Sequence, residues 1–320
     1  MDVTYERLVF SKSGSTLIEF LGVITMSAFK PLLAGSLKCG TIKFPVLMSP
    51  KIDGIRCMIM DGKALTRSLK PVPNIHIRTA LESNPALEGM DGEILVGNSF
   101  AETSSAVMSY SGTPQFTFHV FDRVLTGVGY SDRYAMLVAQ FRAPIANCRL
   151  VLHTLVDDMS QLSAYTLDAM YGGHEGAMVR SLDGKYKYGR STTNEGILLK
   201  IKPLDDSEAV IVGFEEQYHN TNKQVTNELG RSKRSSSQDG MVGAGTLGNF
   251  IVRGTQAEHF GGVRFCVGTG VGLTDQVRQH VWDNKDQYVG KLIKFNYQKI
   301  GSIDKPRIPI FLGFRSSLDT

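Results

Sequence analysis

The chain has 320 residues, enough for one large domain or two ordinary ones, and its 42% apolar and 21% charged residues are typical of a folded globular protein. No uncharged apolar run reaches the ~18–20 residues of a bilayer span. Both acidic and basic residues precede the first apolar run, which suits neither a signal peptide nor a transit peptide. The formal net charge of +4 permits a polyanionic partner without demanding one. Four scattered cysteines argue against a disulfide framework and a structural zinc, so we expect a soluble, intracellular protein.

Residues 1–25 carry no motif that can be interpreted, and we treat them as an N-terminal extension. From Lys30 to Pro203, strand-like runs alternate with helical patterns, which predicts a mixed α+β domain. Strands are expected at residues 45–48, 55–60, 93–96, 116–121, 177–180 and 196–201, and helices at residues 75–82, 131–141 and 159–171.

After Pro203 the pattern changes to strands around a single helix. Strands are expected at residues 208–215, 249–254, 263–268, 292–298 and 308–314. Thr274 is a suitable N-cap for a helix between the third and fourth of these strands. Five strands with a helix in that place match a small OB-type barrel, so we predict a second, all-β domain at 204–320.

A polar, Gly/Ser-rich segment at residues 217–248 stands out within the second domain. It is longer than the usual connection between barrel strands, and such loops are commonly functional or disordered. It carries the basic residues Lys223, Arg231, Lys233 and Arg234. The segment is consistent with either a solvated insertion or a functional one.

The Asp61-Gly62 dipeptide lies between two strand-like runs and predicts a two-residue hairpin. Folding the chain about this turn places Arg56 opposite Arg67, with Lys51 near the same end. Like charges directly opposite are destabilising, and an anion gripped between them relieves the conflict. The hairpin therefore predicts either a phosphate-type site or two solvated surface arginines.

Four further segments place charged side chains at strand ends. In chain order they hold Glu93, the pair Phe121-Asp122, the pair Glu175-Gly176, and Lys200-Ile201-Lys202. Strand alternation puts the two lysines of the last segment on one face. Each segment alone is a common surface feature, but their order along the chain is specific.

That order, from Lys51-x-Asp-Gly-x-Arg to Lys-x-Lys, resembles the signature of the covalent nucleotidyltransferases, and within them the ATP-dependent DNA ligases of the minimal viral type. The likeness runs from about Met26 to the C-terminus and includes residues 30–34, 100–108, 183–192 and 306–311. It implies an adenylyltransferase (ATP-grasp-like nucleotidyltransferase) domain at 26–203, followed by an OB-fold barrel at 204–320. Within the barrel domain it implies a DNA-encircling latch at 217–248.

The resemblance also implies a mechanism. Lys51 attacks the α-phosphorus of ATP and expels pyrophosphate, AMP passes to the 5′-phosphate of a nick, and the 3′-hydroxyl then displaces AMP. Each step is an in-line phosphoryl transfer, so positioning and charge neutralisation supply most of the catalysis. Asp53, Lys200 and Lys202 are implied as further catalytic residues. Asp53 and Glu175 are implied ligands of Mg²⁺ or Mn²⁺.

The implied sites are carried over motif by motif. The ATP and AMP site comprises Ser49, Lys51, Arg56, Glu93, Phe121, Glu175, Met178, Lys200, Lys202, Arg307, Arg315 and Asp319. Arg56 and Glu93 are expected at the ribose, and Phe121 and Met178 are expected on either side of the adenine. The DNA site comprises Arg67 and Arg190 at the nick 5′-phosphate and Lys223, Arg231, Lys233 and Arg234 in the latch.

Three other readings remain: an RNA ligase, an mRNA-capping guanylyltransferase, and a non-catalytic nick-binding protein. The complete motif set argues against the last, because a binder has no need of the nucleophile Lys51. The expected partners are ATP and nicked duplex DNA, with no membrane and no second subunit. The likeness further suggests a virus-encoded protein, and a role in replication, recombination or repair is left open.

Overall fold

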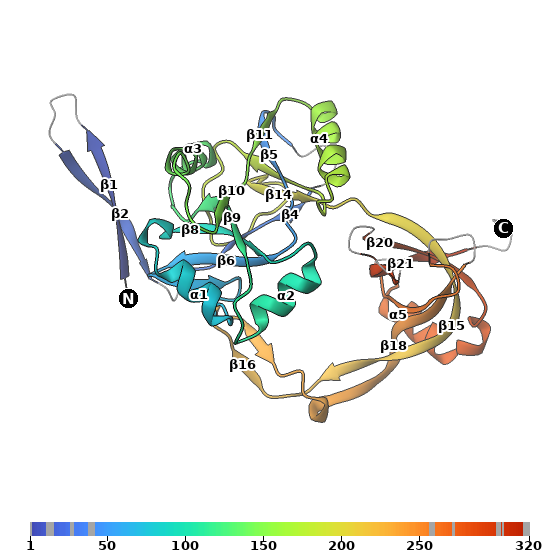
Figure 1. Ribbon diagram of the computed structural model, residues 1–320. Helices are drawn as coiled ribbons and strands as arrows, with labels where there is room; N and C mark the ends of the chain where they lie inside the picture. The colour runs from blue at the N-terminus through green and yellow to red at the C-terminus, as the bar shows by residue number, and fades with distance from the viewer. Residues whose placement is uncertain are drawn as a thin grey trace. The chain divides into compact units, whose positions relative to one another are not determined.

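The computed structural model describes residues 2–10, 16–25, 29–37, 42–255, 260–270, 273–298, 302 and 304–315. The chain divides into two compact units, drawn in Figure 1. The first unit comprises Met1–Ile201 and Thr226–Arg231, and the second comprises Lys202–Val225 and Ser232–Thr320. None of the helices in the described parts of the chain is long and apolar enough to cross a bilayer.

The N-terminal extension forms a β-hairpin. Strands β1 (Asp2–Phe10) and β2 (Thr16–Thr25) pair antiparallel, with Leu8 opposite Ile18. The register shifts between Thr4 and Glu6, which marks a β-bulge. Sequence patterns predicted no element here.

Two five-stranded sheets form the framework of the first unit. One has the order β10-β9-β8-β6-β7, with strands Cys148–Leu150, Thr117–Arg123, Met90–Leu95, Ile55–Met60 and Lys63–Thr66. The other has the order β11-β5-β12-β14-β4, with strands Thr154–Val156, Val46–Pro50, Ala177–Ser181, Leu198–Ile201 and Gly35–Ser36. A short parallel pair joins β3 (Leu32–Leu33) to β13 (Gly189–Arg190). All six predicted strands of this region are confirmed, with ends shifted by a few residues.

Four α-helices cover these sheets: α1 (Ile75–Glu82), α2 (Phe100–Met108), α3 (Tyr130–Gln140) and α4 (Met159–Tyr171). A single 3-10 turn (Pro85–Leu87) follows α1. Three of the helices are confirmed predictions. The sequence prediction missed α2, although Ser99 and Glu102 form a capping box at its start.

Apolar side chains on one face of each element account for this packing. Leu81, Val107 and Leu137 from α1, α2 and α3 share one buried cluster with the β6-β8-β9 sheet. Leu162 of α4 packs in another cluster with Met48 and other side chains of the second sheet. The amphipathic periods therefore fix which helix covers which sheet.

The second unit is built on a closed barrel with the strand order β15-β18-β19-β21-β20. Its strands are Asp205–Asn220, Met241–Gly254, Arg264–Gly268, Arg307–Phe314 and Leu292–Gln298, and its α-helix is α5 (Asp275–Asp283). A 3-10 turn (Lys285–Gln287) follows α5. Thr274 caps α5, because its hydroxyl accepts a bond from Val277 N at 3.4 Å. The predicted OB-type barrel is confirmed.

The segment 217–248 differs from the expected loop, because much of it is paired strand. β15 and β18 continue beyond the barrel, and Tyr218 pairs with Gly243 and Asn220 with Met241. Between them lie β16 (Gln224–Thr226), β17 (Ser232–Arg234) and a 3-10 turn (Gln238–Gly240). Polar strands can pair in this way because an extended ribbon satisfies its backbone groups without an apolar core.

Candidate functional site: a lysine-centred cavity in the first unit

A cavity of about 200 Å³ opens in the first unit. Nine of the sequence-predicted site residues line it: Ser49, Lys51, Arg56, Arg67, Glu93, Phe121, Met178, Arg190 and Lys200. They come from both sheets, from the residues directly after β5 and β7, and from β13. The structure therefore brings together residues that are scattered over 152 positions of the sequence, from Ser49 to Lys200.

Strand register explains how these side chains come to share one wall. Met178 on β12 lies opposite Ser49 on β5 and Lys200 on β14. Directly opposite residues of an antiparallel pair point to the same face of the sheet. Three of the predicted nucleotide contacts thus form a row across three neighbouring strands.

Lys51 lies directly after β5 and is held there by two contacts to the Glu175-Gly176 turn. Its backbone N donates to Gly176 O at 2.9 Å. Its ammonium group forms an ion pair with the carboxylate of Glu175, whose side chain is buried. The turn before β12 therefore holds both the backbone and the amine of Lys51 in place.

Arg56 is bound by an acid that the sequence motifs did not single out as a site residue. Its Nε and Nη2 lie 2.5 and 2.6 Å from the two carboxylate oxygens of the buried Asp91, and Nη2 also donates to Leu32 O at 3.2 Å. Burial opposes the charged guanidinium, but the Asp91 pair outweighs it and raises the pKa of Arg56. Asp91 stands two residues before Glu93 on the same strand, and that spacing was the available signal.

Arg56 and Arg67 are not a cross-strand pair, contrary to the prediction from the hairpin. The hairpin and its register are confirmed, since Met58 pairs with Leu65, but the β6-β7 ladder ends at Cys57 and Thr66. Arg56 instead lies opposite Glu93 on its other neighbour, β8. The register stops because the chain turns after Thr66, where Leu69 N donates to Thr66 O at 2.8 Å.

Arg67 and Arg190 form a second basic centre of the cavity. Burial first, and then the positive charges of Arg190, Arg56 and Arg231, lower the pKa of Arg67. Arg190 Nη1 donates to Ala34 O at 2.5 Å, which directs this side chain along the cavity wall. Two guanidinium groups kept this close are suited to an anion such as a phosphate.

Glu93 is the acid of the cavity. Burial raises its pKa to about 7, against the opposing effect of Arg56 and Lys51. The charge of Arg56 is largely committed to Asp91, and so it does not restore the ordinary acidity of Glu93. This carboxyl therefore changes charge near neutral pH.

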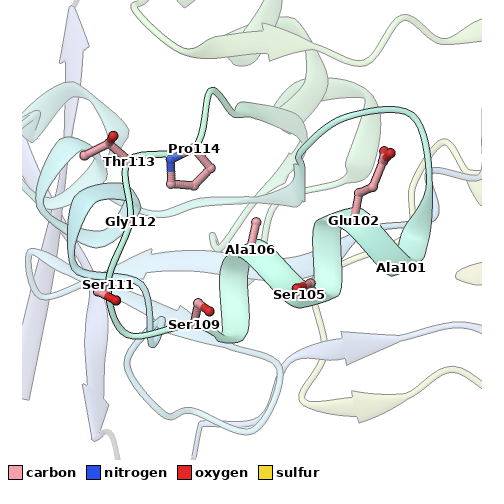
Figure 2. Close-up of a pocket in the computed structure, with 9 residues that line it drawn as sticks. All are labelled: Ala101, Glu102, Ser105, Ala106, Ser109, Ser111, Gly112, Thr113 and Pro114. Carbon is pink, nitrogen blue, oxygen red and sulfur yellow. The ribbon is translucent and has the colours of Figure 1, made fainter.

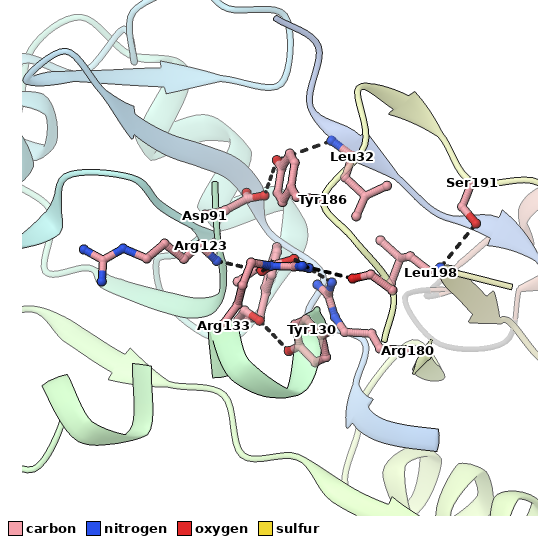
Figure 3. Close-up of polar contacts among 12 residues, drawn as sticks. Leu32, Asp91, Arg123, Tyr130, Arg133, Arg180, Tyr186, Ser191 and Leu198 are labelled. Carbon is pink, nitrogen blue, oxygen red and sulfur yellow. Dashed lines mark hydrogen bonds and ion pairs between the residues drawn. The ribbon is translucent and has the colours of Figure 1, made fainter. Parts of the chain in front are cut away.

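Phe121 lies close to two guanidinium groups. Its ring centroid is 4.9 Å from Arg56 Cζ and 5.5 Å from Arg180 Cζ. Arg180 and Arg133, which are labelled in Figure 3, both bind the buried Asp122, at 2.8 Å each. Despite burial, these two arginines lower the pKa of Asp122. Arg180 also lines the cavity but was not among the predicted site residues, although it lies two positions after Met178 on the same strand face.

The remaining predicted residues do not line this cavity. Asp53 lies two residues after Lys51 in the sequence, and Glu175 contacts the Lys51 ammonium group. Lys202 is the first residue of the second unit. Arg307 begins β21, and Arg315 follows that strand with its Nε 2.5 Å from Glu208 Oε1. Asp319 lies outside the described residues.

The four basic residues predicted for the latch are all exposed. Lys223, Arg231, Lys233 and Arg234 lie on the β16-β17 ribbon or directly beside it. Arg234 is braced by Asn222 O and by Gln224 Oε1, the latter at 3.4 Å. The ribbon therefore presents its positive charges to solvent.

A larger hollow, of about 740 Å³, lies along α2 and the loop after it (Figure 2). Its lining is small and polar, and its one carboxylate, Glu102, already accepts bonds from the backbone of Asn98 and Ser99. Within the described residues, no group of three or more His, Cys, Asp or Glu is placed to hold a metal ion. The cavity beside Lys51 is therefore the candidate site.

In comparisons with known proteins, the chain is similar to DNA ligases. A family model described as a DNA ligase OB-like domain matches residues 240–315. The solved structure of Chlorella virus DNA ligase-adenylate is 32% identical, covers 91% of this chain and 99% of its own, and has a TM-score of 0.51. A Lig E DNA ligase structure, 22% identical with a TM-score of 0.65, covers 88% of this chain and 98% of its own and supports the fold alone.

A probable DNA ligase of Kineococcus radiotolerans is 28% identical over 194 residues, which are 53% of this chain and 36% of that relative. The chain therefore spans about a third of the length of this curated relative. The α+β unit and the OB-type barrel are the two parts that the resemblance to DNA ligases predicted. The chain belongs to the DNA ligase family, because it is 32% identical over nearly the whole of the Chlorella virus enzyme.

Proposed function

We propose that the protein is an ATP-dependent DNA ligase that seals nicks carrying a 5′-phosphate and a 3′-hydroxyl. The observation that carries the proposal is the position of Lys51, at the edge of a cavity that also holds Glu93, Phe121 and Lys200. A nucleophile, a carboxyl, an aromatic ring and a second amine are what AMP transfer to lysine needs. The proposed functional domains are residues 26–203 for adenylylation and 204–320 for the OB fold.

The first step joins Lys51 to AMP. The amine gives up a proton, its nitrogen bonds to the α-phosphorus of ATP, and the bond to pyrophosphate breaks. Lys200, on the same cavity wall, is proposed to stabilise the charge that develops on the α-phosphate. Lys202, Arg307, Arg315 and Asp319 are proposed as further residues of the ATP site.

The nucleotide is held by residues that the two sheets supply. Phe121 and Met178 are proposed as the walls of the adenine slot, with Ser49 beside them on the neighbouring strand. Arg56 and Glu93, opposite each other on β6 and β8, are proposed to bind the ribose hydroxyls. Asp91 fixes the Arg56 guanidinium for that task by a two-pronged ion pair.

A divalent cation, Mg²⁺ or Mn²⁺, fits the carboxylates beside Lys51. Asp53 and Glu175 would hold it, and Glu175 already contacts the amine that must react. Few carboxylates suffice, because magnesium keeps several waters and takes further oxygens from phosphates. When bound, the ion would neutralise charge on the triphosphate. Asp53 and Glu175 would also set the distance between that charge and Lys51.

The second and third steps take place on DNA. Arg67 and Arg190 are proposed to bind the 5′-phosphate of the nick, whose oxygen attacks the phosphorus of AMP and breaks its bond to the Lys51 nitrogen. The exposed basic ribbon around Arg231 and Lys233 is proposed to bind duplex phosphates as a latch, a sequence-independent and salt-sensitive mode. AMP leaves when the 3′-hydroxyl attacks. We propose a monomeric, intracellular and virus-encoded enzyme, by analogy with the Chlorella virus ligase.

The decisive experiment combines ATP labelling with nick sealing. Wild-type protein with α-labelled ATP and Mg²⁺ should take up label and seal a 5′-phosphate nick, and Lys51→Ala should do neither. Labelling by GTP, or sealing of nicked RNA in preference to DNA, would point to the capping or RNA-ligase alternatives. Nick binding without labelling would instead leave a non-catalytic binder.

A further inference from the structure

A closed ring of hydrogen bonds connects Arg56 to the segment that carries Arg190. Arg56 Nη2 binds Asp91 Oδ2 at 2.6 Å and Leu32 O at 3.2 Å. The Tyr186 hydroxyl donates to the same Asp91 oxygen at 2.8 Å and accepts from Leu32 N at 3.3 Å. Figure 3 shows the two bonds of Tyr186, to Asp91 on one side and to Leu32 on the other.

Tyr186 connects this ring of hydrogen bonds to the strand that carries Arg190. Leu32 and Leu33 on β3 pair in parallel with Gly189 and Arg190 on β13. Tyr186 lies four residues before Arg190, at the start of the run that leads into β13. Tyr186 thus bonds one strand of this pair and lies three residues before the start of the other.

The ring of hydrogen bonds is buried, and the Tyr186 hydroxyl in it stays protonated. Tyr186 is 3% exposed and Asp91 is fully buried. Burial and the negative charge of Asp91 raise the pKa of the Tyr186 phenol well above its ordinary value. The phenol therefore keeps its proton near neutral pH. Removing the Tyr186 hydroxyl would take one hydrogen-bond partner from Leu32 N and one from an Asp91 oxygen.

We propose that Tyr186 is a positioning residue that sets Arg56 for the ribose and Arg190 for the nick 5′-phosphate at once. This inference rests on the proposed function of the cavity. It assigns the hydroxyl no contact with substrate, so its effect reaches the reaction through Asp91 and Leu32. Both nucleotide loading and sealing should therefore depend on one buried oxygen atom.

The test is Tyr186→Phe beside a matched control, Tyr134→Phe. The Tyr134 hydroxyl also accepts from a backbone N–H, that of His153 at 3.0 Å, and donates to a carbonyl, Val151 O at 3.4 Å. Tyr134 does not line the cavity. Two activities are measured: the KM for ATP in lysine labelling, and the single-turnover rate of sealing a nick that already carries AMP.

Tyr186→Phe should raise the KM for ATP and slow the sealing of the adenylylated nick, each by about three- to tenfold. Its thermal unfolding midpoint should stay near that of Tyr134→Phe, which should retain wild-type activity. Asp91→Asn, a second variant that weakens the same ring, should reproduce both defects. In an Arg56→Ala background, Tyr186→Phe should add nothing to the KM defect, because the group that it positions is gone.

Equal activities of the two tyrosine variants would overturn the inference, as would a full additive loss in the Arg56→Ala background. The second result would mean that Tyr186 acts through general stability. Failure of the wild-type protein to take up label would contradict the proposed function itself, and with it the inference. Normal wild-type sealing with an unaffected Tyr186→Phe would contradict the inference alone.

Discussion

The ammonium group of Lys51 and the carboxylate of Glu175 form an ion pair beside the cavity of the first unit, although they lie 124 positions apart in the sequence. The lysine side chain is 19% exposed and the glutamate side chain 2% exposed. The pair is therefore accessible from the lysine side only. An incoming phosphate can reach the amine, while the carboxylate stays behind it.

Replacing Glu175 by Gln should slow the labelling of Lys51 by about tenfold or more, since a charge-assisted contact that orients the amine is lost. The measurement is the rate of label uptake from α-labelled ATP. Glu195→Gln is the matched control, because Glu195 pairs with Lys187 at 2.6 Å outside the cavity lining. Equal labelling rates for the two variants would contradict a role for Glu175.

Glu93 should make the stability of the first unit depend on pH. Its pKa in the folded protein is about 7, above the ordinary value of 4.5. A folded-state pKa raised in this way contributes stability that is complete below about pH 4.5 and is lost as pH rises through about 7. The free energy of unfolding should therefore fall between pH 4.5 and pH 8 by on the order of 1–3 kcal/mol more in the wild type than in Glu93→Gln.

Urea titrations at the two pH values measure this difference. Glu82→Gln, an acid on α1 that accepts from Ala64 N at 3.0 Å, serves as the control and should follow the wild-type dependence. If Glu93→Gln and the wild type lose the same stability over this range, the carboxyl is not held protonated by burial.

Asp122→Ala should destabilise the first unit by about 3–5 kcal/mol, because it leaves two buried arginines without their shared carboxylate. Chemical unfolding followed by fluorescence or circular dichroism gives the value. Asp157→Ala, an exposed position, should change the free energy of unfolding by less than about 0.5 kcal/mol. A small effect of Asp122→Ala would mean that Arg133 and Arg180 are solvated in solution.

Replacing all four basic ribbon residues, Lys223, Arg231, Lys233 and Arg234, by Gln should weaken binding to nicked duplex DNA. The slope of log affinity against log salt should fall by about 3–4, since each phosphate contact contributes about 0.9. Binding at several salt concentrations measures the slope. Label uptake from ATP should be unchanged, and an unaltered slope would show that the ribbon does not contact phosphates.

Local pattern was enough to predict many elements of this fold. The period of apolar residues located α1 and α4 with their observed bounds, and alternation with turn residues located the β6-β7 hairpin and its register. It missed α2, whose capping box was readable, and the β1-β2 hairpin. It also took the polar ribbon for a loop, because pairing between polar strands leaves no apolar signature.

The order of motifs likewise selected the residues of the candidate site. Nine of them meet in one cavity, as the resemblance to DNA ligases led us to expect. Which acid neutralises which base was not predictable in the same way. Asp91 is 35 residues from Arg56, and Asp122 is 58 residues from Arg180.

By itself, the sequence determined the faces of the strands and helices, the barrel that follows the mixed domain, and the chemical types of the side chains that line the candidate site. Those features follow from short-range periodicity and from chain order. Only the tertiary structure decided that Arg56 forms an ion pair with Asp91, that Lys51 forms one with Glu175, and that the Tyr186 hydroxyl bonds both β3 and Asp91. Such pairings depend on which strands become neighbours in a sheet and in what register, and these choices are made by burial of the whole core rather than by any local run of residues.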